Sequence, residues 1–146
     1  MKVPGCELCE QEGGAIVLAN EWLRVVLVDD PDFPGFARVI WNDHVREMTD
    51  LDSSARSRLL ETALAVERAQ REVLKPTKIN LASLGNVTPH LHWHVIPRFS
   101  DDSHFPQPIW GQRRRSVHHD RTTERRDSLA LLQRRIAEEV SRVPRS

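Results

Sequence analysis

Short apolar runs bounded by polar, proline or glycine residues recur along the chain, and they predict β-strands. The predicted strands are residues 15–19, 22–28, 36–41, 79–84 and a histidine-containing strand that ends near residue 99. Glycine and proline frame residues 1–14, and acidic residues accompany them at 29–35, so we predict a loop and a turn at these two places.

Elsewhere the apolar residues recur in steps of three and four, which is the period of an amphipathic helix. The first such stretch runs from about Asp52 to Lys75, where Pro76 prevents continuation, and Thr49 or Ser53 is available to cap its start. The second stripe comprises Leu129, Leu132, Ile136, Val140 and Val143. Its apolar side must pack on the domain itself or on another subunit.

This order of elements predicts an α+β fold, with a mostly antiparallel sheet of about five strands, one long central helix and an additional C-terminal helix. The length of 146 residues suits one domain. We assign residues 1–112 to that domain and residues 113–146 to a helical extension.

Charge and hydropathy narrow the range of partners. Lys plus Arg and Asp plus Glu number 21 each, so no net charge draws the chain to nucleic acid, and we interpret Arg113–Arg115 as a solvated surface. No early apolar run resembles a signal peptide and none is long enough to cross a membrane. We therefore expect a cytoplasmic protein that binds neither membrane nor nucleic acid.

The histidine-containing strand carries His90, His92 and His94 at every second position, so in an extended strand the three imidazoles share one face. A neutral imidazole is a competent nucleophile near pH 7, because its ordinary pKa is about 6.5. Such a triad could therefore attack a phosphorus centre while the flanking histidines orient the nucleophile. Three histidines are also a common catalytic zinc shell, so the residues alone leave both chemistries open.

Residues 85–96, Gly-Asn-Val-Thr-Pro-His-Leu-His-Trp-His-Val-Ile, resemble the signature of the histidine triad family. The segment 38–41 followed by His44, and the Pro34-Gly35 pair before it, are similar to the family's preceding strand. The resemblance covers roughly residues 4–110. It implies an α+β fold, a homodimer joined edge to edge through its sheets, and no organic cofactor. The implied activity is hydrolysis or transfer at the α-phosphate of dinucleoside polyphosphates or nucleoside phosphoramidates.

By position, the resemblance implies that His92 is the nucleophile that becomes nucleotidylated. It places His94 near the phosphate and the leaving group, and His90 at the other end of the site as a support. Family members commonly carry a histidine directly after Pro-Gly, where this chain has Phe36. A hydrogen-bonding partner of the triad is therefore missing, and the rate or the choice of substrate is expected to differ.

Three further residues match nucleotide-binding positions of the family. Asn80 and Asn86 lie where the family places amides that bind phosphate or leaving-group oxygens, although local turn chemistry explains each of them equally well. Asp29 lies near the family's ribose-binding acid.

The only two cysteines, Cys6 and Cys9, form a Cys-x-x-Cys pair, which in a reducing compartment favours metal binding or redox chemistry over a structural disulfide. The resemblance to bacterial family members implies a structural zinc held by these cysteines together with His44 and His90. The alternative is a pair of reduced thiols with an exposed His44. If His90 binds zinc, it anchors His92 and does not donate protons.

Three functions therefore follow from the sequence. The first is a nucleotide hydrolase or transferase that acts through His92. The second is a nucleotide- or partner-binding protein with little turnover, suggested by Phe36 and by the basic C-terminal helix. The third is a zinc-dependent hydrolase with its metal at the triad.

Overall fold

Five antiparallel strands form one sheet in the computed structural model, which describes residues 1–145. The strands are β1 (Ala15–Ala19), β2 (Leu23–Leu27), β3 (Ala37–Trp41), β4 (Lys78–Ala82) and β5 (His92–Arg98), in the order β1-β2-β3-β5-β4. The helices are α1 (Glu7–Glu10), α2 (Ser53–Leu74), α3 (His119–Asp127) and α4 (Leu129–Ser141), and a 3-10 turn spans Met48–Asp50. The predicted α+β fold is confirmed.

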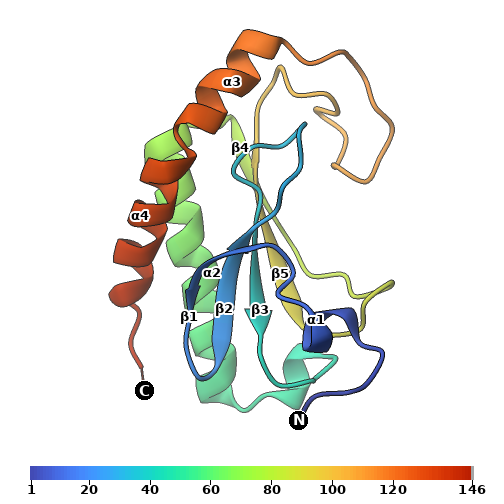
Figure 1. Cartoon of the computed structure of the whole chain (residues 1–146), viewed down its shortest axis with the longest axis vertical. Helices are drawn as coiled ribbons and strands as arrows, with labels where there is room; N and C mark the ends of the chain where they lie inside the picture. Colours follow the sequence, from blue (N-terminus) through green and yellow to red (C-terminus); the bar gives the residue numbers. More distant parts are fainter. Residues whose placement is uncertain (146) are drawn as a thin grey trace.

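Helix α2 lies along one face of the sheet, and α4 packs beside it (Figure 1). Leu132 and Ile136 of α4 are fully buried in the same core as Leu59 and Val66 of α2. The apolar stripe near the end of the chain is therefore covered by the domain itself. Within residues 1–145, every helix is too short or too polar to cross a membrane.

The start of α2 differs from the prediction in its cap. Asp52 is the N-cap, and its carboxylate accepts a hydrogen bond of 2.8 Å from the backbone N–H of Ala55. Thr49 lies in the preceding 3-10 turn and Ser53 is already helical, so neither occupies the capping position. At the other end Lys75 adopts a left-handed conformation (φ 50°) directly before Pro76, which confirms the predicted stop.

Two local features of the chain differ from the predicted strand and loop. Residues 1–14 contain the one-turn helix α1, in which the Cys6 carbonyl accepts N–H groups from Cys9 and Glu10. One turn is too short to show a helical period in sequence. In addition, β5 begins at His92, so His90 lies in the turn that precedes the strand rather than within it.

The register of β3 and β5 determines which side chains share a face of the sheet. Val95 pairs with Ala37 and Trp93 with Val39, and these residues belong to the core beneath α2. His94 pairs with Arg38 and His92 with Ile40, so these four project from the other face. The period-two alternation thus keeps the two strand histidines away from the helix layer.

The segment after β5 is held by a buried ion pair. Arg98 Nε donates to Asp102 at 2.8 Å, and both side chains are no more than 3% exposed. Arg98 also donates to the Asn80 side chain and to the Gln107 carbonyl. Burial by itself would raise the pKa of the Asp102 carboxyl, but the Arg98 guanidinium and neighbouring backbone N–H groups outweigh burial and lower it.

Replacing Asp102 with Asn is expected to lower the free energy of unfolding by about 3 kcal/mol, because it leaves the buried Arg98 charge unpaired. Urea unfolding at pH 7 measures this loss. The matched control is Asp32→Asn, which removes the partly exposed partner of Arg113 and should cost less than about 1 kcal/mol. A loss at Asp102 no larger than the loss at Asp32 would contradict the assignment.

The same pair predicts a pH dependence. The pKa of Asp102 is lower in the folded protein than the value of about 3.9 for an unfolded chain, so its contribution is fully present above about pH 4. It disappears as the pH falls through the folded-state pKa. The difference in stability between the wild type and Asp102→Asn should therefore be constant from pH 7 to 5 and shrink in more acidic solution.

Candidate active site and metal centre

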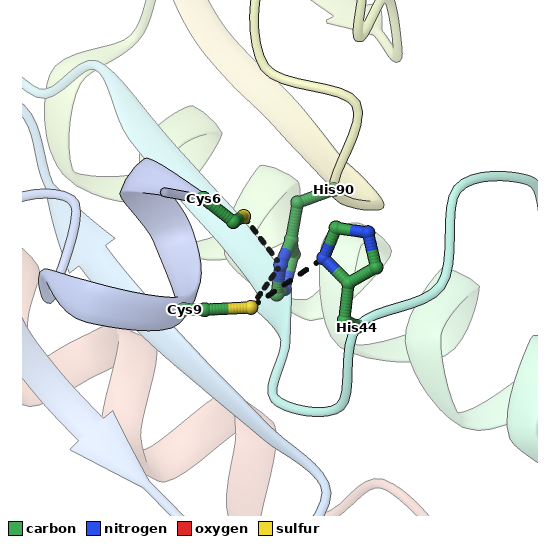
Figure 2. Close-up of side chains that lie close together, drawn as sticks. All are labelled: Cys6, Cys9, His44 and His90. Carbon is green, nitrogen blue, oxygen red and sulfur yellow. Dashed lines mark hydrogen bonds between the residues drawn. The ribbon is translucent and has the colours of Figure 1, made fainter. Parts of the chain in front are cut away.

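Four side chains from three separate segments converge beside the N-terminal end of β5 (Figure 2). Cys6 is the N-cap of α1 and Cys9 lies within this helix. His44 follows β3, and His90 precedes β5. Their ligand atoms all lie within 4.8 Å of one another, and Cys9 Sγ lies 3.4 Å from Nδ1 of both histidines. The prediction that these four residues form one group is confirmed.

The geometry of this group fits a tetrahedral zinc ion. Zinc bonds of about 2.3 Å to sulfur and 2.0–2.1 Å to nitrogen imply sulfur–nitrogen edges of about 3.6 Å in a tetrahedron. The distance of 3.4 Å from Cys6 Sγ to His90 Nδ1 is close to that value. Burial raises the pKa of the Cys9 thiol, so a thiolate there requires a compensating cation. Residues Cys6, Cys9, His44 and His90 could therefore hold zinc in a closed shell.

The other nitrogen of His90 is also engaged. Its Nε2 lies 2.5 Å from the Trp41 carbonyl oxygen, so this nitrogen carries the proton and donates it. That assignment leaves Nδ1 with a lone pair directed at the cysteines, as metal-binding histidines with a carbonyl partner commonly show. Both ring nitrogens of His90 are thus engaged within the protein, whereas Nε2 of His92 has no such partner among residues 1–145.

His92 is held by the backbone of His90. Its Nδ1 lies 2.6 Å from the His90 carbonyl oxygen, which fixes Nδ1 as the protonated nitrogen and leaves a lone pair on Nε2. Burial lowers the pKa of His92, the hydrogen bond to His90 opposes that effect, and the positive charge of Arg38 lowers it further. The ring is therefore a neutral imidazole with a defined tautomer, which is the reactive form.

His94 lies beside His92 in an aromatic enclosure. Its ring centroid is 4.8 Å from that of His92, 5.5 Å from that of Phe36 and 5.0 Å from that of Trp110. Burial lowers the pKa of His94 to about 3, and the nearby His92 ring and the positive charge of Arg38 act in the same direction. His94 therefore stays neutral at pH 7. Phe36, which stands where the family commonly has histidine, covers this ring with apolar surface.

The predicted nucleotide-binding residues lie in different places. Asn80 is on β4, and its side-chain oxygen accepts from Arg98 at 2.8 Å, at the wall of a groove of about 590 Å³ that also reaches Trp110. Asn86 is exposed in the turn after β4, and Asp29 is exposed after β2. Within residues 1–145, no hydrogen bond or ion pair joins the side chain of Asn86 or Asp29 to the triad.

Two residues near the triad were not among the sequence candidates. Trp110 reaches His94 from the irregular segment after β5, and only the folded path of that segment reveals the contact. Arg38 is marked in the sequence as the charged residue that interrupts an otherwise apolar strand, at the position that alternation assigns to the histidine face.

Comparison with known proteins identifies the family. The profile of the HIT domain matches residues 10–101, which is more than half of the chain. The chain belongs to the HIT domain family. The expected histidine triad resemblance is thereby confirmed, and this HIT domain includes α2 and strands β1 to β5.

Relatives of this HIT protein include an enzyme named AP-4-A phosphorylase from Mycobacterium tuberculosis, which is 28% identical over 108 residues. The match covers 70% of this chain and 55% of the relative, so the chain spans about half the length of the curated relatives it matches. A histidine triad protein from Bradyrhizobium japonicum superposes with a TM-score of 0.71 at 29% identity, covering 86% of this chain and 92% of its own.

A Zn-bound histidine triad family protein from Mycobacterium smegmatis has the same fold, with a TM-score of 0.63 at 21% identity. The match covers 94% of this chain and 96% of that structure.

We expect the purified protein to contain about one zinc ion per chain, and Cys9→Ser to lose it, because Cys9 lies within 3.4 Å of both histidine nitrogens. Loss of a metal that binds only the folded state should lower the melting temperature by at least about 5 °C. Elemental analysis and thermal unfolding on the same samples measure both effects. A wild-type protein that melts at the same temperature with and without a chelator would refute a structural metal.

Proposed function

We propose that this HIT protein is a hydrolase or nucleotidyl transferase that cleaves nucleotide conjugates at the α-phosphate through a covalent intermediate on His92. The observation that carries the proposal is the 2.6 Å contact between His92 Nδ1 and the His90 carbonyl. A histidine whose Nδ1–H is held by a carbonyl presents the Nε2 lone pair in a fixed direction. Fixed orientation of an already neutral nucleophile is what phosphoryl and nucleotidyl transfer require.

The proposed reaction has two steps. In the first, His92 Nε2 forms a bond to the α-phosphorus, and the bond from phosphorus to the leaving group breaks, with its electron pair departing on the leaving group, which takes up a proton from solvent where it leaves as an amine. In the second, water or another acceptor forms a bond to the same phosphorus and loses its proton to solvent, while the bond from phosphorus to Nε2 breaks and its electron pair returns to Nε2. His94 is neutral at pH 7, so we assign it a hydrogen bond to an oxygen of the reacting group rather than a proton transfer.

The substrate classes that we propose are dinucleoside polyphosphates and nucleoside phosphoramidates, and the name of the Mycobacterium tuberculosis relative favours the first. Asn80 is proposed to bind phosphate through its amide N–H groups, since Arg98 already occupies its oxygen. Asn86 and Asp29 are proposed as further nucleotide contacts. The homodimer implied by the resemblance also stays a prediction, and β1 and β4 are the edge strands through which sheets could join.

A catalytic zinc at the triad is not favoured. A zinc ion that performs hydrolysis needs an open coordination position, whereas the two cysteines and two histidines together make a closed set of four ligands. Zinc bound there would fasten α1 to the turn before β5 and fix His90, which in turn holds His92. We therefore propose a structural role for the metal.

Brief mixing of the wild-type protein with radiolabelled diadenosine tetraphosphate or adenosine phosphoramidate should leave a labelled adenylyl group on the protein. His92→Ala should lose the adduct and at least about 1,000-fold in kcat/KM, because it removes the nucleophile. The matched control is His119→Ala, an exposed histidine at the start of α3, which should form the adduct as the wild type does. Acid-quenched gels and steady-state assays provide the two measurements.

Full activity without an adduct in His92→Ala would refute the proposed mechanism. If instead the wild type binds these nucleotides tightly but turns them over no faster than His92→Ala, the binding protein without turnover becomes the better account.

A further inference from the structure

Two arginines on neighbouring strands project from the face of the sheet that carries His92 and His94, and their guanidinium groups differ in how many hydrogen bonds they make. Arg24 of β2 pairs with Ile40, and Arg38 of β3 pairs with His94, so both side chains lie on that face. Arg24 uses four of the five N–H donors of its guanidinium, three on backbone carbonyls near α1 and one on the Asn42 side chain. Arg24 therefore has a structural role, because it holds the N-terminal segment against the sheet.

The guanidinium of Arg38 makes fewer hydrogen bonds than that of Arg24. Within residues 1–145, its side chain makes one hydrogen bond, from Nη1 to the Gly13 carbonyl at 2.9 Å. Its Nε is buried and lacks a hydrogen-bond partner among the described residues. No carboxylate of residues 1–145 lies within ion-pair distance of Arg38, and Glu7 is the acidic residue whose charge influences it. Donors of this guanidinium are therefore available for another acceptor.

The position of Arg38 connects these donors to the triad. Its Cα pairs with that of His94 across the β3–β5 ladder, and the guanidinium carbon lies 5.7 Å from the centre of the Phe36 ring, which also contacts His94. Its positive charge is felt by both His92 and His94. Arg38 thus places a positive charge on the same face of the sheet as His92 and His94, at the ladder position directly opposite His94.

The energetics of this arrangement favour an anion. Arg38 is partly buried without an ion-pair partner, which is unfavourable for a charged group, and this partial burial lowers the pKa of its guanidinium. A phosphate oxygen would supply the missing acceptor, and arginine to phosphate hydrogen bonds are among the strongest that side chains form. Phe36, by contrast, provides no polar atom at the place where the family commonly has histidine.

We propose that Arg38 is a phosphate-binding residue of the triad site, donating N–H groups of its guanidinium to a non-bridging oxygen of the phosphate group that lies against His92 and His94. The inference rests on the proposed function for the identity of the ligand, a phosphate ester or anhydride. It assigns to Arg38 part of the charge stabilisation that a transferring phosphoryl group needs.

A purely structural role for Arg38 predicts something different. In that case its hydrogen bond to Gly13 is its whole contribution, and replacement changes stability without changing the affinity for phosphate. Lysine separates the two roles in part, because it retains the charge and loses the planar fork of donors. Arg24→Lys is the matched control, since it makes the same change on the same face at an arginine whose guanidinium already makes four hydrogen bonds within the protein.

The test is the binding of inorganic pyrophosphate to the zinc-loaded full chain, measured by calorimetry on the wild type, Arg38→Met, Arg38→Lys and Arg24→Lys. We expect Arg38→Met to weaken binding roughly 10- to 100-fold, the range for loss of hydrogen bonds to a charged group. Arg38→Lys should fall between Arg38→Met and the wild type, and Arg24→Lys should stay within about 2-fold of the wild type. Near-UV circular dichroism checks that each variant is folded.

A second readout is independent of any variant's stability. In the wild-type protein, the Nε–H resonance of Arg38, assigned by its absence in Arg38→Lys, should shift on addition of pyrophosphate with the same midpoint as a ring resonance of His92. Wild-type protein that does not bind pyrophosphate, unchanged affinity in Arg38→Met and Arg38→Lys, or an unmoved Arg38 resonance would each overturn the proposal. Because no turnover is involved, these outcomes are separate from the adduct experiment on His92.

Discussion

The hydrogen bond from His92 Nδ1–H to the carbonyl of His90 is the contact on which the rest of the site depends. His90 is fixed from its other side, because its ring lies between the Trp41 carbonyl and the two cysteines. The orientation of the proposed nucleophile is therefore set by a chain of contacts that begins in α1. A metal ion in the cysteine–histidine group would stiffen this chain without touching substrate. Three histidines with equal spacing in sequence thus have unequal surroundings and unequal proposed roles.

The sheet separates architecture from chemistry by its two faces. Apolar side chains of β3 and β5 pack beneath α2, and this packing fixes the register that places His92 and His94 on the opposite face. On that opposite face, the cysteine–histidine group lies at one end of the histidine pair, and Trp110 lies against His94 at the other. The Arg98–Asp102 pair holds the start of the segment that carries Trp110. This buried ion pair therefore contributes both to the stability of the fold and to the position of Trp110 at the site.

Much of this arrangement could be predicted from local pattern. The period of apolar residues identified the strands, α2 and α4, and the resemblance to the family brought Cys6, Cys9, His44 and His90 into one group. What could not be predicted depends on which partner a polar side chain finds after folding. Asp52 rather than Thr49 or Ser53 caps α2, because the cap depends on where the helix begins to within one residue. The partners of Arg38 and Trp110 come from segments distant in sequence, and no local period encodes such contacts.

The proposed role of His92 as the nucleophile requires one particular protonation state of its ring. In protein labelled with ¹⁵N at histidine, multiple-bond correlation spectra at pH 7 report which nitrogen of His92 carries the proton. We predict a neutral His92 with the proton on Nδ1 and a free lone pair on Nε2, because the His90 carbonyl accepts that proton's hydrogen bond. A His92 protonated on Nε2, or on both nitrogens, would contradict the assignment of Nε2 as the attacking atom.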